Sequence, residues 1–138
     1  MKNNNLYNLA NQENIPIVDS YIEDCNGAFI RNGEIKFIVL NQKNISNSKQ
    51  ENCVLAEELG HYYMDATYNI DCEDVDFINK QEYKAKKWAY TTLIPFNKLK
   101  LLIDEYQDLY EVADKLDVTY DFLVDTIKYY KTKRLELL

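Results

Sequence analysis

Residues 54–63 read VLAEELGHYY, the most informative stretch of the chain. Its apolar residues recur at the spacing of an α-helix, which predicts that the stretch is helical. Glu57 and His61 are four residues apart, so on a helix their side chains lie on one face, one turn from each other. The stretch therefore predicts a helix that presents a carboxylate and an imidazole side by side.

The spacing of Glu57 and His61 is that of the HExxH metal motif, in which residues i and i+4 bind zinc and the second residue is the general base. Glu57 stands where the motif has its first histidine, and Glu58 stands at the position of the base. His61 is the only histidine in the chain, which excludes a site with two histidines. If a metal binds, we expect Glu57 and His61 to be its first pair of ligands.

Glu82 is the best candidate for the third protein ligand that a catalytic zinc site needs. It lies at the start of the next predicted helix, residues 80–93, where the small residues Ala85 and Ala89 would permit close packing against the first helix. A second interpretation stays open. Asn79 and Glu82 have the spacing of a helix cap and its third helical residue, in which case Glu82 would only begin the helix.

The three cysteines form no CxxC pair, so neither a disulfide framework nor a zinc knuckle is indicated. Cys53 lies one turn before Glu57 and would share its face of the helix. Two interpretations are open for this thiol: an inert buried side chain, which is the commoner case, or a redox-sensitive neighbour of the site.

The first third of the chain predicts a small sheet. Asn32-Gly33 lies between two apolar runs, and this dipeptide is a strong hairpin signal because both central residues of the turn need positive φ. We expect a three-stranded sheet that contains antiparallel strands across residues 15–41. Alternation places Ile35, Phe37 and Val39 on one face of its last strand.

The other elements are predicted to be helical. Residues 2–13 favour a first helix, and Ser48 to Glu51 fits a capping box at the start of the helix that carries His61. Pro95 ends the following helix, and two or three more helices are expected over residues 96–134. Strands followed by helices indicate an α+β fold.

Composition limits the function further. The chain has 138 residues with 46% hydrophobic and 28% charged, which suits a single domain over residues 1–138. A net charge of −7 argues against nucleic acid or a membrane surface as a direct partner. Residues 110–132 look superficially like a helix-turn-helix unit, but Asp121 and Asp125 would repel phosphate, so we expect two packed helices there. No secretion signal or membrane span is visible, and we expect a soluble cytoplasmic protein.

The chain resembles the ImmA/IrrE family of metallopeptidase-like proteins, most closely the short forms of phages and integrative elements of Gram-positive bacteria. Residues 55–63 (LAEELGHYY), residues 82–89 (ExxAxxWA) and residues 93–95 (LIP) carry the resemblance. Residues 118–131 fit the same subgroup. Two motifs in the right order are far more specific than one short match.

The resemblance implies a gluzincin-like α+β domain and a zinc-dependent endopeptidase that cuts or relieves a helix-turn-helix repressor. His61 and Glu82 match the family's metal ligands and Glu58 matches its base, whereas Glu57 departs from its first histidine. Zinc with one histidine and two glutamates leaves a site charge of about zero instead of about +1, so the bound water should ionise less readily. Oxygen-rich ligation also favours harder metals, so manganese or another divalent ion is an alternative to zinc.

Two main functional hypotheses follow from the sequence. In the first, the protein is a metalloendopeptidase-like enzyme that acts on the repressor. In the second, the site is weak or inactive and the protein is a binding module, an antirepressor that holds the repressor without cutting it. A structural accessory protein of a phage operon is a third hypothesis.

Overall fold

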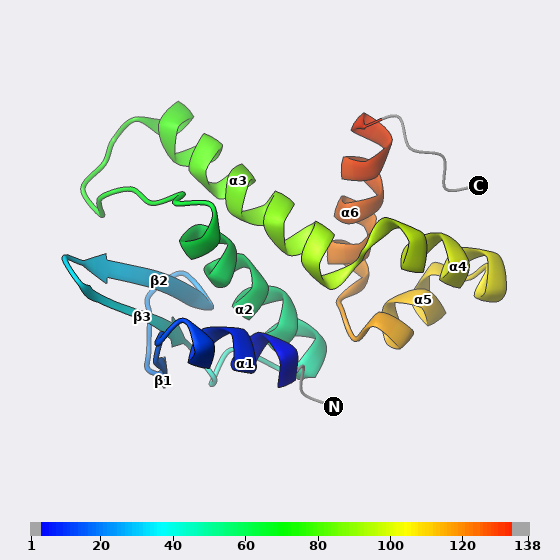
Figure 1. The fold of residues 1–138 in the computed structure, drawn as a ribbon, viewed down its shortest axis with the longest axis horizontal. Helices are drawn as coiled ribbons and strands as arrows, with labels where there is room; N and C mark the ends of the chain where they lie inside the picture. The colour runs from blue at the N-terminus through cyan, green and yellow to red at the C-terminus, as the bar shows by residue number, and fades with distance from the viewer. Residues whose placement is uncertain (1–3, 134–138) are drawn as a thin grey trace.

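The computed structural model describes residues 4–133 of the chain. Its helices and strands, in chain order, are α1 (Asn4–Gln12), β1 (Ile17–Asp19), β2 (Gly27–Asn32), β3 (Ile35–Leu40), α2 (Ser48–Tyr63), α3 (Val75–Leu93), α4 (Phe96–Tyr106), α5 (Leu109–Leu116) and α6 (Tyr120–Thr132). The predicted α+β class is confirmed. The long helix α3 packs against α2 and leads to the group formed by α4, α5 and α6 (Figure 1).

The predicted sheet is present, with strand order β1-β3-β2. β1 pairs with β3 in parallel, and β2 with β3 as the predicted antiparallel hairpin, whose turn has Gly33 at φ 63°. Ile35, Phe37 and Val39 share one face of β3 as predicted, but the fully buried residues Ile38 and Leu40 lie on the other face, and Ile35 is 65% exposed. The last residues of the strand are all apolar, so alternation alone does not show which face meets the core.

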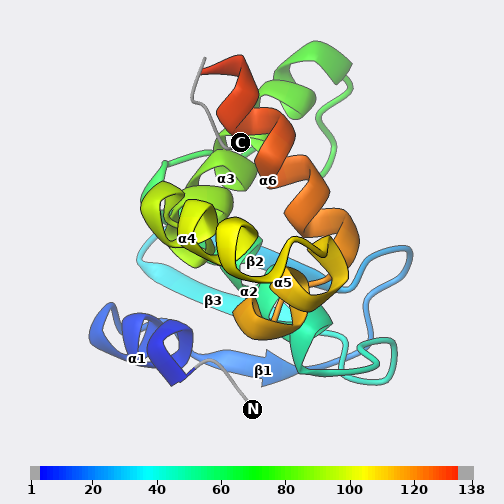
Figure 2. The ribbon, with the colours of Figure 1, turned by 90° about the vertical axis from the view of Figure 1, so that its right-hand side faces the viewer.

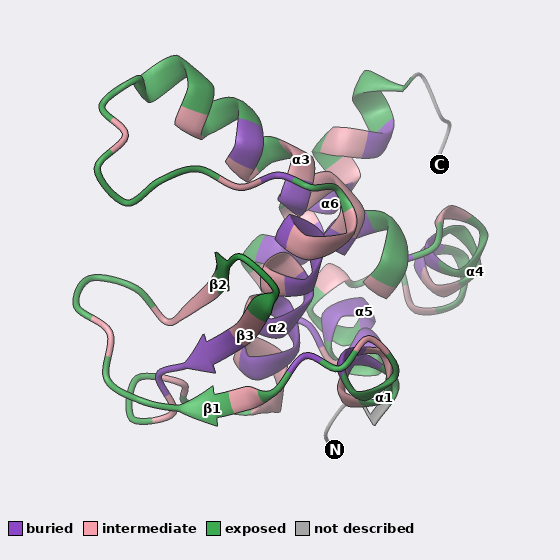
Figure 3. Ribbon diagram, turned by 60° about the vertical axis from the view of Figure 1, so that its left-hand side comes forward, coloured by how far each residue is buried: buried purple, intermediate pink, exposed green. Residues whose placement is uncertain are grey.

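α2 is the central helix of the molecule. It packs against α1, β2, β3 and α3, and its inner side chains are buried (Figure 3). Leu55, Ala56 and Leu59 are completely inaccessible to solvent. Gly60 faces the backbone of α3, where a Cβ atom would overlap the carbonyl oxygen of Ala85 and stand 3.0 Å from its Cα. The glycine thus permits the close approach of α2 and α3 that places their side chains together.

The start of α2 differs from the predicted capping box. Asn47, not Ser48, is the cap, because its side chain accepts a hydrogen bond from the backbone N–H of Gln50 at 2.9 Å. The hydroxyl of Ser48 instead donates to the carboxylate of Asp117 at 2.9 Å. A contact across the fold therefore overrides the local pattern of Ser48 to Glu51.

Ser48, Asn52 and Asp117 form a polar clasp between α2 and the turn that follows α5. The side-chain amide of Asn52 donates to the backbone carbonyl and to the carboxylate of Asp117, at 2.9 and 3.0 Å. Asp117 ends α5 with φ 54°, in the left-handed region. Asn52 is only 2% exposed, so water has little access to its side-chain amide. Its hydrogen bonds to Asp117 take the place of hydrogen bonds to water.

Asn52→Ala is expected to lower the free energy of unfolding by about 1–3 kcal/mol, because it leaves the acceptors of Asp117 without these donors. Urea denaturation measures the change. Asn69→Ala, in the exposed loop before α3, is the matched control and should stay within about 0.5 kcal/mol of wild type. Equal stability of the two variants would contradict the clasp.

α3 begins earlier than predicted. It starts at Val75, and the side chain of Asp74 caps it by accepting from the backbone N–H of Phe77 at 3.1 Å. Glu82 therefore lies inside the helix, and the interpretation of Asn79 and Glu82 as a cap and its partner is wrong. The short polar run before Val75 contains several residues able to cap a helix, so the sequence did not identify the one that does.

The C-terminal part contains the three helices α4, α5 and α6, which lie together on one side of the molecule (Figure 2). The hydroxyl of Tyr130 in α6 donates to the backbone carbonyl of Ile94 at 2.6 Å, which ties α6 to the junction of α3 and α4. Residues 2, 3 and 134 of the predicted helices lie outside the described part. Within residues 4–133, no helix has the length and apolar character needed to cross a membrane.

Candidate metal centre

His61 of α2 and Glu82 of α3 form the centre of the site. The Nε2 atom of His61 lies 3.1 Å from a carboxylate oxygen (Oε2) of Glu82. The two residues come together because Gly60 lets α2 approach the backbone of α3 beside Ala85. The sequence placed both residues on helices, and the structure shows that these helices bring them into contact.

The other nitrogen of His61 holds the ring in place. Nδ1 lies 2.6 Å from the backbone carbonyl of Ala66, in the loop after α2, and donates to it. Burial lowers the pKa of His61, but its hydrogen bonds to Glu82 and Ala66, together with the negative charges of Glu58 and Glu82, outweigh burial and raise the pKa to about 9. The hydrogen bond from Nδ1 to the carbonyl fixes the ring so that Nε2 faces Glu82. Metal-binding histidines are oriented in the same way.

Glu82 accepts two hydrogen bonds at the same oxygen. Besides His61, the hydroxyl of Tyr68 donates to Oε2 at 2.9 Å. The hydrogen bond from His61 lowers the pKa of Glu82 more than any other contact does, and Tyr68 adds to that effect. Glu82 is therefore an ionised carboxylate beside an imidazole. Carboxylates and imidazoles are both zinc ligands, so the two residues could bind a metal together.

Glu58 is a half-buried carboxylate on the same helix as His61. Its pKa is raised to about 7: burial is the largest cause and the nearby carboxylates of Glu57 and Glu82 add to it, while His61 and the backbone N–H of Phe29 act against the rise. A pKa near the working pH is what a general base requires. The predicted base thus has the electrostatic environment for that role.

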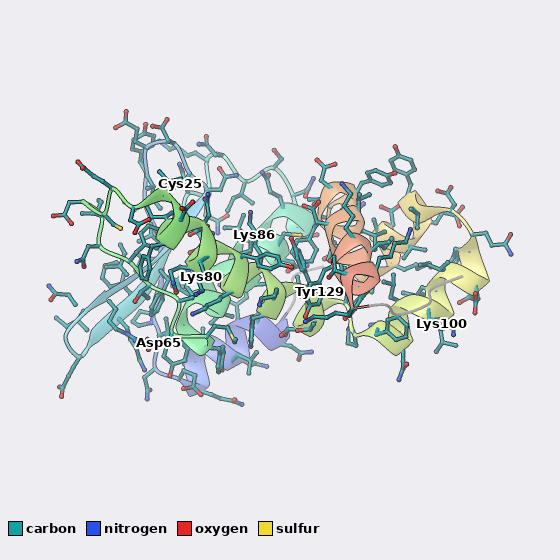
Figure 4. All side chains as sticks on the ribbon, turned by 90° about the horizontal axis from the view of Figure 1, so that it is seen from above. Cys25, Asp65, Lys80, Lys86, Lys100 and Tyr129 are labelled. Carbon is teal, nitrogen blue, oxygen red and sulfur yellow. The ribbon has the colours of Figure 1, made fainter. Side chains whose placement is uncertain are left out.

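Glu57 lies on the same helix face as His61 but has different surroundings. Burial raises its pKa, and the ammonium group of Lys86, midway along α3 in Figure 4, is the main charge that opposes this rise. Among residues 4–133, no three His, Cys, Asp or Glu side chains are grouped so that they could hold a metal ion. The structure brings His61 and Glu82 together without adding Glu57 to the pair, and its role as a ligand stays a prediction.

The cysteines add little to the site. Cys53 is 8% exposed and lies 3.9 Å from the hydroxyl of Thr119. Burial raises the pKa of its thiol to about 11, which favours the inert interpretation. Cys25, labelled in Figure 4, is exposed. The pKa of its thiol is raised, first because part of the side chain is shielded from water and then because of the negative charge of Glu58.

Ala66 and Tyr68 lie in the loop between α2 and α3, and neither residue was predicted from the sequence. Ala66 acts through its backbone carbonyl, for which a side-chain pattern carries no signal. Tyr68 is one of 12 tyrosines in the chain, and nothing in its spacing distinguishes it from the others. Only the folded loop brings both residues to His61 and Glu82.

The α+β fold, the paired Glu58 and His61 of α2 and the glutamate of α3 define a metallopeptidase-like protein. The comparison with known families agrees with this class. Residues 10–128 match the model of a peptidase family, described as the IrrE N-terminal-like domain, and the chain belongs to that family. The resemblance found in the sequence is therefore confirmed. No curated protein matches the chain.

Proposed function

We propose that this protein is a cytoplasmic metalloendopeptidase of a phage or mobile element that acts on a helix-turn-helix repressor. The observation that carries the proposal is the contact of His61 with Glu82 near the half-buried carboxylate of Glu58. Two ligand groups and a base are the protein parts that metal-assisted peptide hydrolysis needs first. The family match supports the same reaction class.

The chemistry of the donor set fits a metal in part. Nε2 of His61 and Oε2 of Glu82 would hold a divalent ion, with Glu57 as the third predicted donor, and zinc is the first expectation. Such an ion supplies positive charge that polarises a peptide carbonyl and the attacking water. Glu58 takes the proton of that water and delivers it to the leaving amine. Ala66 keeps the ring of His61 in the orientation that this arrangement requires.

The loop that carries Tyr68 and the first turn of α3 have exposed apolar residues that suit a protein partner. Three large apolar residues of the loop after α2 and the first turn of α3 are exposed: Ile70 at 103%, Val75 at 64% and Phe77 at 43%. This part of the chain extends away from the sheet (Figure 3). Exposed apolar side chains next to a site favour a polypeptide over a small polar substrate.

A binding module is the second candidate, and one observation favours it. No three possible ligands are grouped within residues 4–133, and the charge that most opposes the raised pKa of Glu57 is Lys86. With only two donors in place, the protein would hold the repressor through the same surface and leave it intact. The two candidates differ in whether a metal is bound and whether the partner is cut.

Metal content separates them first. Purified without chelator or tag, the wild type should carry close to one divalent ion per chain by elemental analysis, and His61→Ala and Glu82→Ala should lose it. Glu73→Ala, an exposed carboxylate in the loop before α3, should keep it. If the wild type stays without metal after zinc or manganese is added, the enzyme is ruled out and the binding module is favoured.

The partner is tested by coexpression with the helix-turn-helix proteins encoded beside the gene. Intact-mass analysis that shows two fragments of such a protein supports the endopeptidase. Copurification of the uncut protein supports the binding module. If no such protein is cut or retained, the proposed partner is wrong.

A further inference from the structure

The loop after α2 is held at three points, two of which are at the site. Asp65 forms an ion pair with Arg31 of β2 and accepts its hydrogen bond at 3.1 Å, which ties the loop to the edge of the sheet. The carbonyl of Ala66 accepts from Nδ1 of His61. The hydroxyl of Tyr68 then reaches across to Glu82. Residues 65–68 therefore contact both members of the His61–Glu82 pair.

Tyr68 and His61 share one oxygen atom of Glu82. Oε2 lies 2.9 Å from the hydroxyl of Tyr68 and 3.1 Å from Nε2 of His61. A carboxylate oxygen has two lone pairs, so both donors can be accepted at once. The ring of Tyr68 lies edge-on to the imidazole with 6.5 Å between the ring centres. Tyr68 thus touches both partners of the pair from one side.

Glu82 needs such a restraint because its side chain is 35% exposed. A glutamate on a helix has several rotamers, and a half-exposed carboxylate can turn towards water. The phenol of Tyr68 is a neutral donor in the physiological range, as tyrosine hydroxyls ordinarily are. The hydroxyl therefore gives Glu82 a constant hydrogen bond that favours the rotamer facing His61.

We propose that Tyr68 is a positioning residue of this site, whose hydroxyl holds the Glu82 carboxylate against Nε2 of His61. The consequence for metal binding rests on the proposed function, whereas the effect on the His61–Glu82 contact does not. A hydrogen bond to a ligating carboxylate orients it, and its loss weakens metal binding by about 10–100-fold. Tyr68 would act on metal affinity in that way, through Glu82.

Tyr68→Phe tests the proposal because it removes the hydroxyl and keeps the ring. Tyr62→Phe is the matched control, since the hydroxyl of Tyr62 also donates to a glutamate, Glu13, at 2.6 Å. Neither residue is buried, so both variants should fold. Both are compared with wild type in metal-free protein and then with zinc.

The first measurement is hydrogen exchange of the two imidazole protons by NMR, with histidine labelled with nitrogen-15. His61 is the only histidine, so the spectrum contains one ring. In Tyr68→Phe the Nε2 proton should exchange about tenfold faster, the factor for losing one hydrogen bond to a charged group. The Nδ1 proton, bonded to Ala66, should keep its rate and serves as an internal control.

Three results would overturn the proposal: an unchanged rate for the Nε2 proton, an equal increase for both protons, or the same increase in Tyr62→Phe. An equal increase for both protons would mean that the hydroxyl only stabilises the loop in general. None of these results depends on a bound metal, so they are distinct from a failure of the proposed function.

The second measurement is the zinc dissociation constant by competition with a chromophoric chelator. It should rise about 10–100-fold in Tyr68→Phe and stay unchanged in Tyr62→Phe. Zinc affinity equal to wild type in Tyr68→Phe would remove the link between Tyr68 and the metal. If no form binds zinc or manganese, the metalloendopeptidase is rejected, and the imidazole exchange rates alone decide the role of Tyr68.

Discussion

Gly60→Ala is expected to lower the free energy of unfolding by more than about 3 kcal/mol, or to prevent folding. The added Cβ would overlap the carbonyl oxygen of Ala85, which is a backbone atom and cannot rotate away. Alanine gains about 1 kcal/mol of helix propensity over glycine, but this gain is smaller than the cost of separating two buried helices. The separation would also part His61 from Glu82, so metal binding should fall with stability.

Urea denaturation of three variants isolates the cause. Gly33→Ala should cost only about 1–2 kcal/mol, because its turn has φ 63° but nothing lies within 4 Å of an added Cβ. Adding Ala85→Gly to Gly60→Ala should restore nothing, since the obstruction is the main chain of residue 85 and not its methyl group. A Gly60→Ala protein within about 1 kcal/mol of wild type would contradict the close packing of α2 and α3.

The parts of the fold that follow from local physics were predicted well. The helical spacing of residues 54–63 identified the core of α2, and Asn32-Gly33 located the hairpin. Pro95 marked the end of α3, whose capping residue is Ile94. Each of these signals lies within a few residues of the feature it predicts, and tertiary contacts do not oppose it.

The errors arose where contacts across the fold decide between local options. Ser48 has a good capping side chain, yet it bonds to Asp117 while Asn47 takes the cap. The start of α3 lies among several polar residues, any of which can cap a helix, and Asp74 does. Which face of β3 is buried depends on the side of the sheet that α2 covers. The residue pattern of the strand alone does not contain this information.

The candidate site shows the same division. Glu58, His61 and Glu82 were named from spacing and from the family resemblance, and the structure brings the latter two within 3.1 Å. Tyr68 and the carbonyl of Ala66 complete their surroundings from a loop that has no periodic pattern. The proximity of Lys86 to Glu57 likewise depends on the packing of α3 against α2, so it could only be seen once the helices were placed.

Glu58→Gln is expected to lower peptide cleavage by about 10²–10⁴-fold, the usual contribution of a general base. Glutamine has the shape of glutamate, and its amide oxygen can still accept from the backbone N–H of Phe29. It cannot take a proton from water. Shielding a charged carboxylate from water costs free energy, and this cost is the main cause of the raised pKa of Glu58. A neutral amide avoids the cost, so the variant should be at least as stable as wild type.

The measurement compares the cleavage rate of the repressor, the metal content and the urea midpoint of Glu58→Gln with those of Glu73→Gln, an exposed control that should match wild type in all three. Loss of cleavage with metal content and stability retained places the defect in proton transfer. Loss of metal as well would make Glu58 a ligand and not the base. Cleavage at the wild-type rate would remove Glu58 from the reaction, and the raised pKa of its carboxyl would then reflect only its burial between β2 and α2.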